Sequence, residues 1–243
     1  MPQFSDDLYL GPVVRGGAVS DGPSQMDIGI GPLGRVYVYD VAPLILQVAG
    51  LAASQNPGSG ASFTLAAGTG VTTQTVGSET RYVLDVPRSV TIKATGANTA
   101  TYTITGYDVY GQRMSQTLAA PNTSTVTSTK TFKSVVSVTN ANAAAGTNGL
   151  EVGYSDLIGL PVRVTSRDYV IGSNFNATAV ALSAYTVADT TSPATTATTD
   201  VRGYITLPTA ADGTKRLVVA IATPAIAVGP NATRIGALGV TQV

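Results

Sequence analysis

A succession of short segments with alternating apolar and Thr-rich polar positions, separated by Gly, Asn, Asp or Pro, limits the fold most strongly. The alternation predicts strands at residues 62–66, 80–86, 89–95, 100–105, 113–119, 131–139, 150–154 and 160–165. In the segment 89–95 (SVTIKAT), for example, the apolar residues share one face and the polar residues share the other. Segments of this length and spacing predict an all-β fold, an antiparallel β-sandwich of the jelly-roll type or a barrel.

The stretch 103–118 (TITGYDVYGQRMSQTL) combines this alternation with a polar centre. Asp108, Tyr110 and Arg113 are candidates for a small polar site, but they surround a break in the pattern. Gly111 suits the positive φ that a tight turn requires. The stretch therefore predicts a hairpin with its turn at 108–111 rather than a catalytic loop.

The N-terminal segment differs from the rest of the chain. Residues 1–50 contain no Thr and are dense in Gly and Pro, which predicts an extended arm over residues 1–35, followed by a strand at 36–41. Its scattered apolar side chains argue against a purely solvated tail, so we expect the arm to lie across a partner. The expected contact residues are Leu8, Tyr9, Leu10, Val13, Val14, Ile28 and Ile30.

Further along, the domain organisation depends on three segments. Residues 43–54 fit a short helix or a buried strand, and the low-complexity stretch 188–199 fits a linker or a surface loop. The segments 201–207 and 214–223 predict a hairpin around Asp212 and Gly213. We expect a sandwich body over 36–187 that 188–243 completes, although 201–243 could also form a separate lobe.

The composition removes most catalytic chemistry. The chain has no His, Cys or Trp, so it offers no imidazole base, no thiolate nucleophile and none of the usual transition-metal ligands. Glu79 and Glu151 are the only glutamates. We expect no enzyme, no catalytic residue, no metal and no cofactor. A hydrolase built on Asp156, Asp168 or Asp200 is the weakest alternative.

Charge and hydropathy bear on the partners. Fourteen basic and fourteen acidic residues give a net charge of zero, which provides no attraction to nucleic acid or to an anionic membrane. The longest apolar run, 41–53, is interrupted and too short to cross a bilayer, and the first residues do not resemble a signal peptide. Only 12% of the residues are charged, which fits a surface covered by neighbours or an ordinary Thr-rich sandwich.

Several short motifs are better explained by structure than by binding. The glycine-rich stretches 29–34 and 68–70 lack the following helix of a phosphate loop and predict turns. Asp156, Asp168 and their neighbouring arginines predict salt-bridged loops rather than a metal site. Phe132 is expected in the core, which would place Lys130 and Lys133 on the exposed face.

Five blocks occur in a characteristic order. They are DVPRSVTI (85–92), TGYDVYGQRMSQTL (105–118), KTFKSVVSV (130–138), VGYSDLIGLPVRV (152–164) and DVRGYITLPTAADGTKRLVV (200–219). In these blocks the chain resembles a family of tailed-bacteriophage virion structural proteins. The resemblance implies a non-enzymatic decoration or cement protein on the capsid exterior, with a small β-sandwich or jelly-roll fold that is often trimeric.

The same resemblance implies the partners and the location. The partners would be the major capsid protein and further copies of this chain, and the location would be the capsid surface after synthesis in the host cytoplasm. The alternative is a tail, fibre or receptor-binding component. No individual binding residue is carried over, because the resembling blocks are strands and turns.

Overall fold

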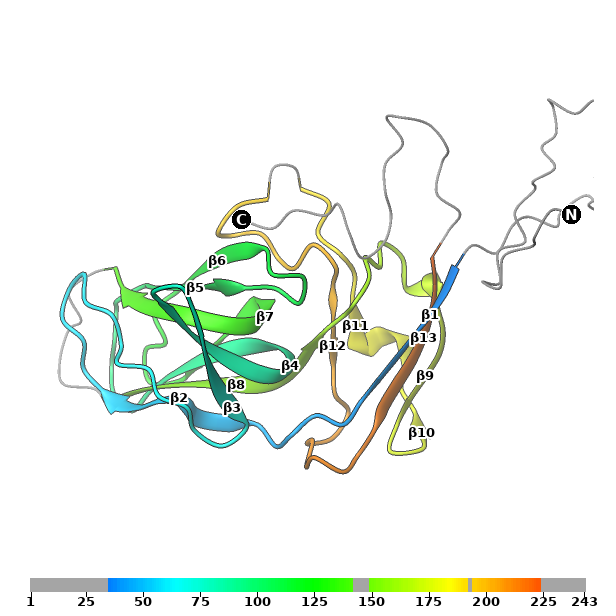
Figure 1. The fold of residues 1–243 in the computed structure, drawn as a ribbon, viewed down its shortest axis with the longest axis horizontal. Helices are drawn as coiled ribbons and strands as arrows, with labels where there is room; N and C mark the ends of the chain where they lie inside the picture. The colour runs from blue at the N-terminus through cyan, green and yellow to red at the C-terminus, as the bar shows by residue number, and fades with distance from the viewer. Residues whose placement is uncertain (1–34, 142–148, 192–193, 224–243) are drawn as a thin grey trace, which may run out of the picture.

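The structure is a computed structural model that describes residues 35–141, 149–191 and 194–223. This part of the chain is almost entirely β-structure, in two antiparallel sheets (Figure 1). The strands are β1 (Arg35–Val41), β2 (Gln47–Gln55), β3 (Val71–Val76), β4 (Glu79–Ala94), β5 (Tyr102–Tyr107), β6 (Arg113–Leu118), β7 (Thr125–Asn140), β8 (Leu150–Gly159), β9 (Val170–Phe175), β10 (Thr178–Ala179), β11 (Tyr185–Thr186), β12 (Tyr204–Thr206) and β13 (Leu217–Thr223). Two single-turn 3-10 helices, η2 (Arg167–Tyr169) and η3 (Leu182–Ala184), lie between strands.

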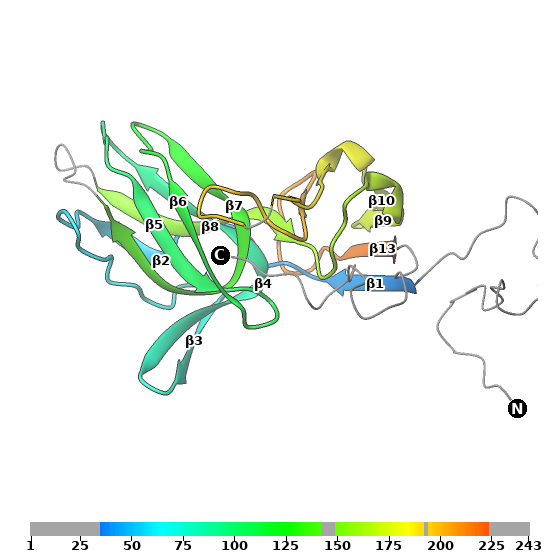
Figure 2. The same cartoon turned by 90° about the horizontal axis from the view of Figure 1, so that it is seen from above.

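The larger sheet has nine strands and curls around its own core (Figure 2). Its order is β11-β12-β8-β4-β7-β5-β6, with β2 paired to β8 and β3 paired to β4. β4 and β7 are 16 residues long, and their pairing register shifts twice. Such irregularities bend strands, and they occur here where β4 curves. β3 and the adjoining part of β4 form a hairpin that projects from the body (Figure 2).

The smaller sheet has four strands in the order β1-β13-β9-β10. Its central strand β13 pairs with β1 over Arg35–Val41 without a register shift and pairs with β9 on its other side. One of its faces packs towards β12 and the adjoining end of the larger sheet. The expected all-β sandwich class is confirmed, but a jelly roll is not, because jelly rolls have eight strands in two Greek keys.

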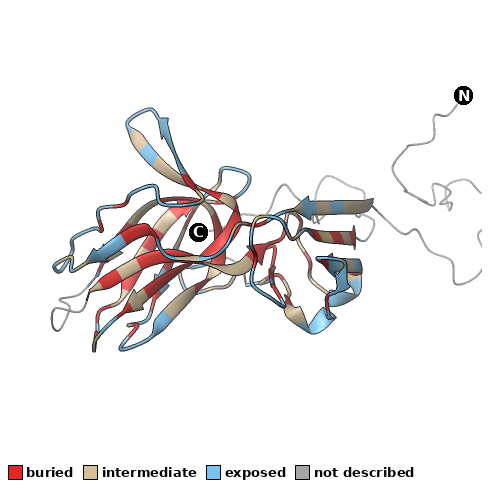
Figure 3. Cartoon of the chain, turned by 90° about the horizontal axis from the view of Figure 1, so that it is seen from below, coloured by how far each residue is buried: buried red, intermediate tan, exposed pale blue. Residues whose placement is uncertain are grey.

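Two apolar clusters divide the core between the sheets. The first lies within the curl of the larger sheet and includes Ile92, Tyr102 and Phe132, and the second joins the two sheets through residues such as Ile158 and Val219. Figure 3 shows buried residues running along the strands of both parts. β4 contributes Ile92 to the first cluster and Val86 to the second, and β8 likewise contributes to both. β4 and β8 therefore connect the two cores.

The expected hairpin at 103–118 is confirmed. β5 and β6 pair from Tyr102–Leu118 to Tyr107–Arg113, and Gly111 has a φ of 77° in the turn. Asp108 supports the turn, since its Oδ1 accepts hydrogen bonds from the backbone N–H groups of Tyr110 and Gln112, both at 2.8 Å. This Asx-type turn explains why an aspartate begins the loop.

Some local expectations have a different outcome. Residues 62–66 form no strand and contribute only an isolated bridge between Ser62 and Thr139. Residues 160–165 form no strand, although Val162 and Val164 are buried, because this segment turns out of the sheet after β8. The expected hairpin around Asp212 and Gly213 is wrong, because β12 pairs with β8 and β11 whereas β13 pairs with β1 and β9. In the ambiguous segment 43–54, residues 43–46 have no regular structure and the rest belongs to strand β2 (Gln47–Gln55).

The stretch 188–199 lies against the body as a surface loop in its described residues. The N–H of Thr117 in β6 donates to the carbonyl of Thr196 at 3.1 Å, and the N–H of Asp189 donates to the carbonyl of Asp200 at 2.9 Å. These bonds tie the loop to the larger sheet and close its two ends on each other. The loop is not a linker between separate bodies.

Candidate functional site

The outer face of the small sheet carries exposed apolar side chains. Tyr37 and Tyr39 of β1 pack on the inner cluster, so the alternate residue Val38 points outward and is 68% exposed. Ala220 is the register partner of Val38, and Ile171 of β9 is 56% exposed. Apolar side chains at the centre of an exposed sheet face indicate an interaction surface.

β1 is also an edge strand in the described part of the chain, where only β13 pairs with it. Natural edge strands are commonly protected by lysine, proline or a bulge. β1 has none of these between Val36 and Tyr39, and its register with β13 is regular throughout. We define the small-sheet surface as the edge of β1 with the outward residues Val36, Val38, Ile171, Val218 and Ala220.

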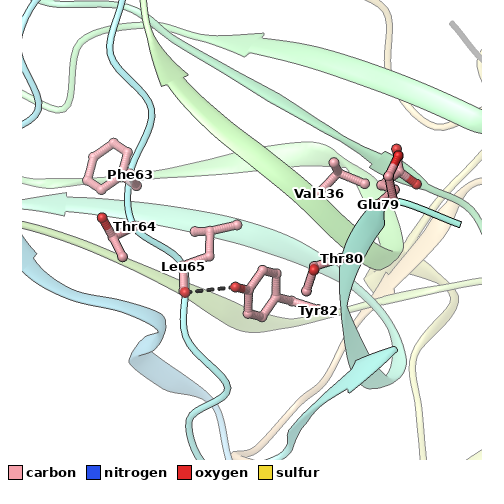
Figure 4. A pocket seen from close by; sticks show the side chains of 8 residues that line it. Phe63, Thr64, Leu65, Glu79, Thr80, Tyr82 and Val136 are labelled. Carbon is pink, nitrogen blue, oxygen red and sulfur yellow. Dashed lines mark hydrogen bonds between the residues drawn. The ribbon is translucent and has the colours of Figure 1, made fainter. Parts of the chain in front are cut away.

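A second candidate is an open pocket of about 540 Å³ beside the projecting hairpin (Figure 4). It is lined by Phe63, Thr64, Leu65, Ser78, Glu79, Thr80, Tyr82 and Val136. Tyr82 Oη donates to the carbonyl of Leu65 at 2.8 Å, so its polar group is already satisfied.

The only carboxylate lining this pocket is Glu79, and its surroundings keep it ionised. Arg81 Nε donates to Glu79 Oε1 at 2.8 Å. Desolvation raises the pKa of Glu79, but hydrogen bonds from Tyr107 and Arg81 outweigh it and lower the pKa. A carboxylate held in its charged form does not serve as a general acid near neutral pH, so the pocket lacks an acid–base pair.

A buried arginine joins the two cores where β4 passes between them. Arg88 is fully buried, and its Nη2 donates to Asp85 Oδ2 at 2.6 Å and to the carbonyl of Leu44 at 2.5 Å. Its Nη1 lies 3.4 Å from Asp156 Oδ1 on β8 and 3.3 Å from the carbonyl of Ser155. Leu44 also donates its N–H to Asp85 Oδ2 at 2.7 Å. The guanidinium therefore fixes the connection between β1 and β2 to β4 and β8.

Burial affects the acids and phenols around Arg88. Desolvation raises the pKa of Asp156 despite the opposing hydrogen bond from Ala211 and the positive charge of Arg88. Burial also raises the pKa of Tyr39, and the charge of Asp85 adds to this shift. Asp85 accepts through Oδ2 only, from Arg88 and from the N–H of Leu44, and its buried Oδ1 has no hydrogen-bond partner, whereas Asp156 is held by Arg88 and by the N–H of Ala211. These bonds tie the segments around Arg88 to one another.

A second buried ion pair holds the β5–β6 turn against the segment before β12. Arg202 Nη2 lies 2.8 Å from Asp108 Oδ2, and the two side chains are 2% and 0% exposed. The guanidinium carbon of Arg202 lies 5.5 Å from the centroid of the Tyr110 ring. The hydroxyl of Tyr110 donates a hydrogen bond to the carbonyl of Pro161 at 2.6 Å. Asp108 and Tyr110 thus form a structural clamp with Arg202, whereas Arg113 is exposed at the start of β6.

Lys130 was expected on the exposed face, and the structure shows that this is wrong. Its side chain is fully buried, with Nζ donating to the carbonyl of Ser115 at 3.0 Å and to that of Thr195 at 2.8 Å. Burial lowers the pKa of Lys130, although the charge of Asp200 opposes the shift. Strand alternation in fact places Lys130 on the same face of β7 as Phe132, two residues later, and the 188–199 loop supplies a carbonyl to its buried ammonium group.

The hydrogen bonds of Asp189 in the same loop lead us to expect that the stability of the fold depends on pH. Hydrogen bonds from Thr191 and Thr199 lower the pKa of Asp189 from 3.8 to about 2. A depressed pKa stabilises the folded chain above pH 4, and this contribution disappears as the pH falls through 4 towards 2. The Asp189→Asn variant should therefore melt about 2 °C below the wild type at pH 7, because the aspartate is partly solvated.

Measuring the same two proteins down to pH 2, where Asp189 becomes protonated, provides the control. Thermal unfolding of wild type and Asp189→Asn followed by circular dichroism should show a Tm difference at pH 7 that closes at pH 2. A constant difference across this range would show that Asp189 acts only as a neutral hydrogen-bond acceptor.

The residues expected to contact a partner lie outside the described residues. Leu8, Tyr9, Leu10, Val13, Val14, Ile28 and Ile30 all belong to this group. Of the charged residues considered as a metal site, Asp156 binds Arg88, whereas Asp168 belongs to η2 and accepts a hydrogen bond from Ser166 at 2.9 Å. Within the described ranges, no three His, Cys, Asp or Glu residues are grouped as metal ligands are.

Sequence reasoning missed the small-sheet surface and both buried arginines. Val38 lies in an alternating segment, and alternation alone does not tell which face is covered. Arg88 follows Pro87 inside a strand, which is a signal, since proline within a strand marks a bulge or an edge. For Arg202, 94 residues separate the partners, so no local pattern could have identified the pair.

Comparison with protein-family models, with curated proteins and with solved structures finds no match for the chain. No helix in the described ranges is both long and apolar enough to cross a bilayer. The geometry of the described residues and the sequence itself therefore carry the functional argument.

Proposed function

We propose that this chain is a structural protein of a tailed-phage virion that decorates the capsid exterior and cements neighbouring major capsid subunits. The observation that carries this proposal is the order of the five sequence blocks between residues 85 and 219. In the structure these blocks supply strands and turns of both sheets, including β4, β7, β8 and β13. They specify a scaffold, as expected of a resemblance that concerns architecture rather than a reactive site.

Two properties support a binding role that depends on contact area. The body carries an exposed apolar sheet face and an edge strand. Its buried arginines, Arg88 and Arg202, form ion pairs with aspartates inside the body. Many weak contacts suffice for a cement protein, because each bound copy can engage several neighbouring subunits at once. In the proposed assembly the copies associate with one another, as a trimer, and with the major capsid protein, while the arm supplies additional contacts.

The arm is tested by removing residues 1–22, which leaves β1 and the residues directly before it in place. Attachment to capsids stripped of this protein should fall at least about a hundredfold, because one of several linked contacts is lost. Cosedimentation with the stripped capsids measures this, and the Tm of the free protein should stay within about 2 °C of the wild type. Unchanged attachment with an unchanged Tm would contradict a cementing arm.

Point substitutions provide a matched pair for this experiment. Leu8→Ser, Leu10→Ser and Val13→Ser combined should reproduce the loss, whereas Gln3→Ala, Ser5→Ala and Ser20→Ala combined should leave attachment unchanged. The copy number per virion, from a quantitative gel of purified particles, then separates a shell protein with hundreds of copies from a tail or fibre component with few. A low copy number would overturn the decoration role.

A further inference from the structure

β3 is the outer strand of the projecting hairpin, and neither of its faces is covered. The residues from Thr72 to Val76 are all exposed, whereas Val71 at the base of the hairpin is buried. Figure 3 shows this change from a buried base to an exposed tip. A two-stranded ribbon that packs on nothing is only marginally stable in water, so a further strand beside β3 would stabilise it.

The neighbouring strand β4 is anchored on both faces at the same level of the hairpin. On one face, Tyr82 donates its hydroxyl to the carbonyl of Leu65 at 2.8 Å. On the other face, the guanidinium carbon of Arg81 lies 3.7 Å from the ring centroid of Tyr107 in β5. The open edge of the hairpin is therefore the far edge of β3, which within the described ranges pairs with β4 alone.

The register of the hairpin determines which backbone groups of β3 face this open edge. Val76 lies opposite Glu79 across a two-residue loop, and the pairing continues to the base without a shift. A two-residue loop closes on a hydrogen-bonded pair, so Val76 and every second residue before it direct their N–H and C=O groups towards β4. The N–H and C=O groups of Thr73 and Thr75 therefore point towards the open edge, where another strand can bind them.

We propose that β3 pairs with β3 of a second copy of the chain, antiparallel about a two-fold axis at Gln74. In this register Gln74 lies opposite Gln74 of the second copy, and Thr73 lies opposite Thr75. Thr72 lies opposite Val76, so every side chain that meets another across the axis is exposed in the single chain. The two hairpins join into one four-stranded sheet, in which each pair of Thr73 and Thr75 exchanges two backbone hydrogen bonds.

The sequence of β3 favours a copy of itself as the occupant. A two-fold axis brings each residue opposite the one that lies equally far from the centre on the other side, so a palindromic strand pairs like with like. Threonines flank Gln74 on both sides, and the next residues outward, Thr72 and Val76, are both β-branched. Such pairs stabilise neighbouring strands, and because β3 has no charged residue, no like charges meet across the axis.

The same properties argue against a strand from a different protein. A foreign strand would bind the same backbone groups, but β3 offers it neither a charge nor a row of apolar side chains to recognise. β3 also lacks the lysine, proline or bulge with which natural edge strands avoid pairing. Self-pairing explains both the missing protection and the missing recognition elements.

The size of the contact sets its expected strength. Two six-residue edges cover less than the roughly 1,200 Å² of total surface that stable complexes bury, so the pairing should be weak between free molecules. It becomes effective where copies are held side by side, because their local concentration is then high. The pairing depends on the chain alone and holds whether or not the protein proves to be a capsid component.

Engineered cysteines test the axis directly, since the chain has no cysteine of its own. Opposite residues of a non-hydrogen-bonded pair have Cα atoms about 4.5 Å apart, within the range of about 4.4–6.8 Å that a disulfide needs. The full-length variant Gln74→Cys should therefore form a disulfide-linked dimer under mild oxidation. The matched control Thr72→Cys lies on the same face, but its two thiols would be about 13 Å apart along the strands. It should dimerise at least about tenfold more slowly.

A mixing experiment checks the register from a second pair of positions. Thr72→Cys and Val76→Cys should each remain mainly monomeric when oxidised alone and should form a mixed dimer when oxidised together. Non-reducing electrophoresis and intact mass identify the products. Equal rates for Gln74→Cys and Thr72→Cys would overturn the axis, and monomers in every sample would overturn the pairing.

Hydrogen exchange tests the unsubstituted protein, so a misfolded cysteine variant does not decide the outcome. The amides of Thr73 and Thr75 should exchange more slowly in concentrated than in dilute protein, whereas the amide of Phe132 in β7 should be unchanged. Thr75→Pro removes an N–H that faces the open edge and leaves the bonds to β4 intact, so it should abolish the concentration dependence at Thr73. Equal exchange of Thr73 and Thr75 at both concentrations would overturn the proposal.

Discussion

Replacing Arg88 by Met should lower the free energy of unfolding by about 3 kcal/mol, because it leaves the half-buried carboxylates of Asp85 and Asp156 without their cation. The guanidinium is fully buried and lies within 2.6 Å of Asp85 and 3.4 Å of Asp156. Methionine matches much of its volume, so the loss reports on charge and hydrogen bonding rather than on a cavity. Urea unfolding followed by circular dichroism measures the change.

A lysine on the same strand provides the matched control. Lys93 also belongs to β4 and pairs with Glu151 at 3.3 Å, but its side chain is 43% exposed. Lys93→Met should cost no more than about 1 kcal/mol, because solvent screens an exposed pair. Similar losses for the two variants, or a stable Arg88→Met protein, would show that the cluster does not hold the two cores together.

Arg202→Met should lower the free energy of unfolding by about 3–5 kcal/mol, because it leaves the fully buried Asp108 carboxylate without its cation. Asp108 then keeps only the backbone N–H groups of Tyr110 and Gln112 as donors. The charge at Oδ2 has no compensating partner in a site that water does not reach. Urea unfolding again measures the loss, and faster exchange of the Gln112 amide would locate it at the turn.

The double variant Asp108→Asn, Arg202→Met distinguishes a stranded charge from lost packing. Asparagine keeps the acceptor for Tyr110 and Gln112 but carries no charge, so the double variant should be more stable than Arg202→Met alone. Coupling between contacting partners is typically about 0.5–3 kcal/mol. If adding Asp108→Asn lowers stability further, the burial of an unpaired carboxylate does not explain the effect of Arg202→Met.

The strands were predictable because alternation is a local property of the chain. The hairpin of β5 and β6, the strand through 89–95 and the all-β class all follow from periodicity and from turn residues such as Gly111. The strand ends were less well predicted: β4 runs through Pro87 as a single strand, because a register shift absorbs the missing N–H. Local signals do not show how far a neighbouring strand extends the pairing.

The candidate surface could be predicted only in part. The arm residues Leu8 and Ile28 were identified from the sequence as contact candidates, and they remain a prediction outside the described residues. Val38 was predicted to lie in a strand, but its exposure depends on which sheet β1 joins and on which face meets the core. Since β1 pairs with β13, some 180 residues away, no window of sequence contains that information.

The amino-acid sequence by itself determined the β-strand content, the β5–β6 turn and the absence of imidazole and thiol chemistry. These properties follow from residue identity and from the two-residue period of a strand. Only the tertiary structure decided that β12 and β13 belong to different sheets, that Lys130 is buried, and that Arg88 and Arg202 are internal clamps. The physical reason is that burial and charge pairing depend on segments distant in the chain, whose approach is set by sheet order.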